Sequence, residues 1–195
     1  SRGFEGMAQR LGPGPLYSLL EGPLRDAAGT AETRDGAVVL RLLELDPGQG
    51  RLTGRSWFYP LASPDHAIGA IQWLAPGRAL VIERDNRQGA AAEVKRVYVV
   101  EVDLATPGSV MRKGAYVDLL AIADPAGVAG TRGTGDGHFR FAFQTIESVV
   151  VLGPDRIGLI NDNNYPFSSG RDPARRDDSE WIELHVPGLS AAVRD

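Results

Sequence analysis

Acidic side chains stand at the ends of several short apolar segments of this 195-residue chain. Glu5 and Glu147 lie near the start of such segments, and Glu83 and Asp162 follow the end of two others. Carboxylates that converge from separate segments repel one another, and a hard divalent cation with oxygen ligands offsets that repulsion. The sequence therefore predicts a cation site, with Ca²⁺ as the expected ion. The predicted ligands are Glu5, Glu83, Glu147, Asp162 and Asn163.

The residues predicted to carry catalysis are Glu83, Arg84 and Glu147. Glu83 directly follows the apolar segment 79–82, where a carboxylate can serve as a metal ligand or a general base. The guanidinium of Arg84 can hold an anionic oxygen of a substrate through two hydrogen bonds. The alternative interpretation is a surface ion pair at 83–85 and a plain turn at 163–164, since Asn and Asp favour turns.

Composition excludes several kinds of chemistry. The chain has no Cys, which excludes disulfides, thiolate zinc sites and cysteine catalysis. It has 21 Lys and Arg against 25 Asp and Glu, and this acidic balance argues against binding to a phosphate backbone. No apolar run approaches the roughly 20 residues of a membrane helix. We therefore expect neither a nucleic acid nor a membrane as partner.

The elements that must position these residues are short strands. The chain contains 24 Gly and 13 Pro, too many for a helical protein, and short apolar segments alternate with Gly, Pro, Asp and Asn. This pattern predicts an all-β chain of antiparallel strands joined by tight turns.

An internal repeat organises these strands. Residues 74–86 resemble residues 152–164, and residues 11–21 form a looser copy. The alignment places Asn161 opposite Glu83 and Glu21, and it gives Glu5, Gly69 and Glu147 one shared place.

About four strands in each repeat predict about three four-stranded blades of a β-propeller, with an ordinary sandwich as the alternative. Three blades cannot close a ring, because known propellers have at least about four. Residues 1–195 are therefore expected to form a single domain that is incomplete at its N-terminus. The remaining blades of the same protein, or self-association, would cover the open flanks.

Five segments resemble the phytase-like family, which is described by an esterase-like activity of phytase. They occur in the family's order at residues 2–8, 20–24, 79–85, 145–149 and 159–164. The resemblance covers nearly the whole chain and implies the C-terminal half of a β-propeller domain. It also implies a secreted or periplasmic bacterial protein.

The resulting functional hypothesis is a metal-dependent hydrolase that acts on a small phosphoester or carboxylic ester. One alternative is a non-enzymatic propeller that binds a ligand or a protein and carries structural calcium. Another is a lactonase-like propeller, which also uses Glu, Asn and Asp on one metal. The scarcity of Lys and Arg at the polar strand ends argues against a highly charged substrate such as phytate. In the segment 145–149, Ser148 stands where the family usually has Gly.

Overall fold

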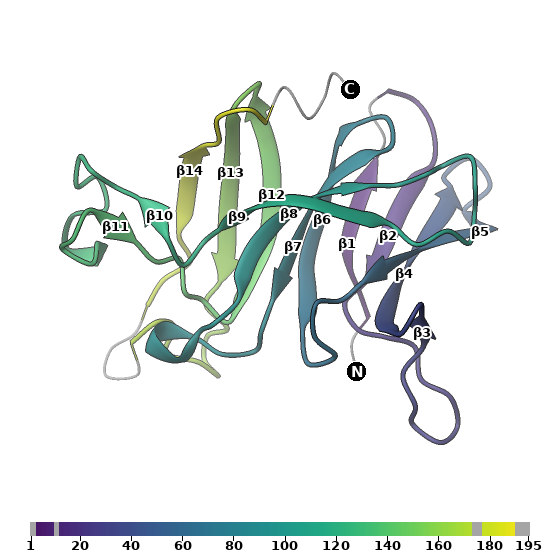
Figure 1. Ribbon diagram of the computed structural model, residues 1–195, viewed down its shortest axis with the longest axis horizontal. Helices are drawn as coiled ribbons and strands as arrows, with labels where there is room; N and C mark the ends of the chain where they lie inside the picture. Colours follow the sequence, from purple (N-terminus) through teal and green to yellow (C-terminus); the bar gives the residue numbers. More distant parts are fainter. Residues whose placement is uncertain (1–2, 10–11, 173–176, 190–195) are drawn as a thin grey trace.

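The computed structural model describes residues 3–9, 12–172 and 177–189, and over these residues the protein is all-β (Figure 1). The described residues form strands, turns and two short 3₁₀ helices, Gly89–Ala91 and Gly130–Arg132, and they contain no α-helix. The prediction of an all-β chain is confirmed.

The strands form three antiparallel sheets and one small hairpin-like pair. The first sheet contains β1 (Phe4–Gln9), β2 (Leu16–Leu20), β4 (Ala37–Asp46), β5 (Arg51–Pro60) and the short β3 (Thr33–Arg34). The second sheet contains β6 (Ala67–Ala75), β7 (Arg78–Arg84), β8 (Lys95–Glu101) and β9 (Arg112–Asp118). The third contains β12 (Thr145–Gly153), β13 (Arg156–Asp162) and β14 (Trp181–His185). The small pair consists of β10 (Ile122–Ala123) and β11 (His138–Phe139).

The first strands of the three sheets lie side by side, because β1 and β12 both contact β6 (Figure 1). The backbones of β6 and β12 approach very closely at Gly69. A Cβ atom on Gly69 would lie 1.8 Å from the carbonyl oxygen of Ile146. On the β1 side, a Cβ atom on Gly6 would lie 3.0 Å from the backbone nitrogen of Ile71. Glycine at these two positions therefore permits the three sheets to pack together.

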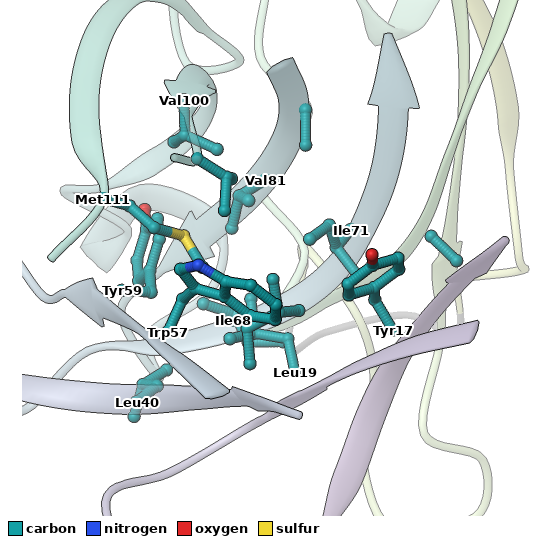
Figure 2. Packing of buried hydrophobic residues seen from close by; sticks show 14 of the residues in the cluster. Tyr17, Leu19, Leu40, Trp57, Tyr59, Ile68, Ile71, Val81, Val100 and Met111 are labelled. Atoms are coloured by element: carbon teal, nitrogen blue, oxygen red, sulfur yellow. The ribbon is translucent and has the colours of Figure 1, made fainter. Parts of the chain in front are cut away.

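Two hydrophobic cores fill the spaces between the sheets, and β6 contributes to both. Figure 2 shows part of the core between the first and second sheets, where Trp57 packs among the side chains of both. Ile68 and Ile71 enter this core, whereas Ala70 and Leu74 enter the core shared with the third sheet. Burial of each large apolar side chain contributes roughly 1.5–3 kcal/mol. The middle sheet is therefore stabilised on both faces.

Each first strand has a register shift near its start, and the extra residue is Glu5 in β1, Gly69 in β6 and Glu147 in β12. These three residues occupy the place that the sequence repeat gave them. A β-bulge redirects a side chain out of the regular alternation of the strand. The repeat is thus present in the hydrogen-bond register of the sheets as well as in the sequence.

The observed strand pairing also shifts the alignment of the first copy of the repeat with the other two copies by one residue. The residues before the three bulges pair with Leu20, Glu83 and Asn161, so these three share one position. The sequence alignment had placed Glu21 opposite Glu83, and the structure places Leu20 there instead. The residues at the next position of the three sheets are Glu21, Arg84 and Asp162.

Candidate functional site

Five charged side chains gather where the first and second strands of the three sheets meet at one edge. We call them the charged cluster: Glu5, Glu21, Arg84, Glu147 and Asp162. In Figure 1 these strand ends lie along the lower edge of the molecule. Arg84 and the three other acids all act electrostatically on the carboxyl group of Glu147. Residues at two neighbouring positions of the repeat, contributed by all three sheets, therefore form one site.

Glu147 in the charged cluster has a pKa well above its usual value. Burial raises the pKa of Glu147 to about 7; Arg84 opposes the increase, and Glu5, Glu21 and Asp162 add to it. A carboxyl group that titrates near neutral pH is well suited to accept or donate a proton in a reaction.

Arg84 is the cation of the charged cluster and is 3% exposed. Its Nη2 donates a hydrogen bond to Oε1 of Glu21 at 3.0 Å, and its Nη1 donates to Oδ1 of Asn86 at 2.9 Å. Its Nε has no hydrogen-bond partner among the described residues. Buried N–H groups are nearly always paired, so an unpaired one in the described residues calls for a partner such as an ordered water or a ligand.

Glu83 lies outside the charged cluster, in a buried group that we call the Glu83 network. Its Oε2 accepts a hydrogen bond from the hydroxyl of Tyr59 at 2.7 Å and contacts Nζ of Lys113. Its Oε1 accepts from the backbone N–H of Ala62 at 2.9 Å and lies 2.7 Å from Nδ1 of His66.

These partners decide the state of Glu83. Burial alone would raise the pKa of Glu83, but Lys113, His66 and Tyr59 together hold it below its usual value. Oε2 is occupied by Tyr59 of the first sheet and Lys113 of the second, and Oε1 by Ala62 and His66 of the connection between these sheets. Because successive residues of a strand point to opposite faces, Glu83 and Arg84 enter different environments.

Asn163 and Asn164 form a turn directly after β13, as the alternative interpretation held. The backbone N–H of Asn164 donates to Oδ1 of Asp162 at 2.9 Å, and Asn164 has a positive φ of 55°. The side chain of Asn163 is engaged within the loop: Oδ1 accepts from the N–H of Tyr165 at 3.0 Å, and Nδ2 donates to the carbonyl of Asp177 at 3.0 Å. Of the predicted site residues, the structure therefore brings together Glu5, Arg84, Glu147 and Asp162.

A cleft of about 730 Å³ opens beside Arg84. It is lined by Gly22, Pro23, Leu24, Arg25, Pro64, Asp65 and Asn86. Asn86 connects the cleft to the charged cluster, because it accepts a hydrogen bond from Arg84 and donates one to the carbonyl of Asp65 at 3.4 Å. Its volume suits a small ligand.

A family model described as phytase-like, esterase-like activity of phytase, matches residues 1–165. The chain belongs to the phytase-like family. The resemblance inferred from the five sequence segments is thus confirmed, and the family's esterase-type description indicates hydrolase activity. The match covers most of this chain. It does not show which part of the family domain the chain represents, so the C-terminal half stays a prediction. No curated protein and no solved structure matches the chain.

The carboxylates of this phytase-like chain are hard oxygen donors of the kind that Ca²⁺ binds. Across residues 3–9, 12–172 and 177–189, however, no three Asp, Glu or His side chains are disposed to bind one metal ion. We therefore derive no reaction step through a cation. Calcium binding stays a prediction.

Lys95 is a buried residue that the sequence reasoning did not identify. Its Nζ donates to Oδ1 and to the carbonyl of Asp85, both at 2.8 Å, and to the carbonyl of Gln144 at 3.2 Å. Asp85 follows Arg84 and Gln144 lies three residues before Glu147, so Lys95 connects the strand ends that carry these two residues. Burial lowers the pKa of Lys95 to about 8, although Asp85 acts to raise it.

The alternating pattern of the strand that contains Lys95 could have identified this residue. Residues 95–101 place buried and partly buried side chains in near alternation, and Lys95 stands on the same side as Val97. A lysine on the inward side of a strand needs a buried partner.

Across the described residues, the chain has no helix long and apolar enough to span a bilayer.

Proposed function

We propose that this phytase-like chain hydrolyses ester bonds at the charged cluster, with the substrate held in the cleft beside Arg84. The observation that carries the proposal is that a carboxyl group with a pKa near neutrality lies near a buried guanidinium whose Nε–H has no partner within the described part of the chain. Glu147 supplies the first and Arg84 the second. An ester or phosphoester hydrolase needs these two functions, proton transfer and stabilisation of a developing oxyanion.

In the proposed reaction, ionised Glu147 accepts a proton from a water molecule, and the oxygen of that water attacks the acyl carbon or the phosphorus. Nε of Arg84 donates a hydrogen bond to the substrate oxygen that gains negative charge. Protonated Glu147 then gives its proton to the oxygen of the leaving alcohol. Glu21 keeps the guanidinium in place through its hydrogen bond at 3.0 Å.

The arrangement of the sheets supports the β-propeller as the architecture. We propose that the three sheets are consecutive blades, because their first strands adjoin and carry equivalent bulges. In β6, Ala70 and Leu74 are each only 7% exposed, because the third sheet covers them. Their equivalents in β12 are Ser148, which is exposed, and Leu152, which is 41% exposed.

The open face of the third sheet therefore has the positions that a further blade would cover. Trp181, which lies over Gly158 on that sheet, is 47% exposed and belongs to the same surface. We propose that the remaining blades of the same protein, or self-association, cover this surface. If the parent chain self-associates in sedimentation velocity and Leu152→Lys reduces that self-association, the second possibility is supported. If the parent chain sediments as a monomer, self-association is excluded for this chain. Secretion or a periplasmic location stays a prediction.

The test of the proposed function is hydrolysis of p-nitrophenyl acetate and p-nitrophenyl phosphate by the purified chain. Glu147→Gln should reduce the rate to background, whereas Glu183→Gln, an acid-to-amide change on β14 outside the charged cluster, should keep it. Addition of Ca²⁺ or EDTA then tests metal dependence. If neither substrate is hydrolysed at any pH or calcium concentration, the hydrolase proposal is wrong and a ligand-binding propeller becomes the better interpretation.

A further inference from the structure

The charge of the site disfavours a phosphate dianion. The charged cluster contains four carboxylates and one guanidinium, and that guanidinium already binds Glu21. The nearby lysines do not offset this balance, because the buried Lys95 is paired with Asp85 and the partly buried Lys113 with Glu83. A phosphomonoester would bring like charge to this cluster, and juxtaposed like charges select against a ligand.

Four exposed large apolar side chains stand close in sequence to members of the charged cluster. Phe4 is 55%, Leu24 45%, Tyr165 60% and Phe167 94% exposed. Each of the four lies within five residues of a member of the charged cluster, and Leu24 also lines the cleft. Exposed apolar side chains that gather at one place indicate a binding surface.

The loop that carries Tyr165 and Phe167 is anchored by polar contacts. The N–H of Phe167 donates to the carbonyl of Asn164 at 2.7 Å. One step further on, Oγ of Ser168 donates to Oε1 of Gln88 at 2.9 Å, which ties the loop to the connection between β7 and β8. The two aromatic rings are therefore presented from a loop fixed to the strand ends of the second and third sheets.

We propose that the site takes uncharged carboxylic esters with an apolar group, in preference to phosphomonoesters. The ester oxygen would accept a hydrogen bond from the buried Nε–H of Arg84, which has no partner among the described residues, and the apolar group would lie against the exposed apolar side chains, of which Leu24 lines the cleft. Hydrolysis adds the hydroxyl of water to the acyl carbon and its proton to the alcohol oxygen as the acyl carbon–oxygen bond breaks. This inference rests on the proposed function and narrows its substrate class.

The kinetic test compares p-nitrophenyl hexanoate, acetate and phosphate. We expect kcat/KM for the hexanoate to exceed that for the acetate by about tenfold, as apolar contacts in a binding site allow. Turnover of the phosphate should be at background. The double variant Tyr165→Ser/Phe167→Ser should bring the hexanoate-to-acetate ratio close to one. Val128→Ser, which changes an 87% exposed side chain in another loop, should keep the parent ratio.

A binding measurement separates this inference from the proposed function. N-phenylhexanamide is an uncharged amide that resembles the hexanoate ester, and phenyl phosphate is its charged competitor; NMR titration gives a Kd for each. Binding of the amide that weakens in the double variant supports the substrate class even if no ester is hydrolysed. Tighter binding of phenyl phosphate, binding of neither compound, or a faster phosphatase reaction would overturn it.

Discussion

Arg84 at the end of β7 donates a hydrogen bond across 3.0 Å to Glu21 at the end of β2, and so joins the second sheet to the first. The two residues occupy the same position of the repeat in successive sheets. An ion pair between equivalent positions ties neighbouring sheets together at the edge where Glu147 enters from the third. The contact fixes the guanidinium on one side and leaves its Nε without a partner among the described residues.

Glu147 should make the stability of the protein depend on pH. Its pKa is raised to about 7 from 4.5, so the folded state binds a proton more tightly than the unfolded state. Stability from this group is complete below about pH 4.5 and is lost as the pH rises through about 7. Glu147→Gln should therefore be more stable than the parent at pH 8 by roughly 1–3 kcal/mol, and the gain should vanish at pH 4.

Urea unfolding of both proteins at pH 4, 6 and 8 measures this difference. Glu183→Gln provides the control, since Glu183 pairs with Arg156 at the surface of the third sheet. A stability difference that does not change with pH would contradict the assignment of the raised pKa to Glu147.

Glu83 should contribute to the stability of the folded protein rather than to hydrolysis. Glu83→Gln leaves Lys113 buried without its counter-charge, and breaking one side of a buried ion pair destabilises a protein by about 3–5 kcal/mol. Guanidinium unfolding should show this loss. Loss of hydrolysis with normal stability would instead restore the catalytic role that the sequence predicted for Glu83.

Lys95→Met should destabilise the protein by about 3–5 kcal/mol, because Asp85 would stay buried without its cation. The double variant Asp85→Asn/Lys95→Met removes both charges and should recover part of the loss. Hydrogen exchange measured by mass spectrometry should increase in residues 84–88 and 144–148 together in the single variant. If only one of the two segments changed, Lys95 would not connect them as described.

Gly69→Ala should be strongly destabilising, since its Cβ would lie 1.8 Å from a backbone oxygen that has no room to move. Overpacking typically costs about 1–3 kcal/mol, and a backbone clash lies at or above that range. Gly153→Ala is the matched control, because nothing lies within 4 Å of the Cβ it would add. Equal melting temperatures for the two variants would contradict the close approach of β6 and β12.

Sequence reasoning identified the strands, the turns, the repeat and four members of the charged cluster. The shared place of Glu5, Gly69 and Glu147 was visible because the Pro and Gly turns fix the ends of the strands that follow. Glu83 was placed in the site because its strand ends there. The sequence does not show on which face of the strand Glu83 lies.

The sequence does not show the register, that is, which residues of neighbouring strands pair with one another. A bulge adds one residue to a strand, and a shift of one residue moves every following side chain to the other face. The observed pairing gives Leu20 the position of Glu83, so Glu21 shares its position with Arg84. Glu83 and Arg84 themselves point to opposite faces because they are consecutive residues of β7. The partners of Lys95 are equally hidden, because Gln144 is distant in sequence and contributes only a backbone carbonyl.

The middle sheet departs from its neighbours at both repeated positions. The first and third sheets supply an acid at each, whereas the second supplies Gly69 and Arg84. Three identical contributions would offer a bound molecule several equivalent orientations. Because the basic group comes from the middle sheet and acids come from both flanking sheets, carboxylates lie on either side of Arg84. A negatively charged group that bound Arg84 would therefore meet like charge in both directions along the edge.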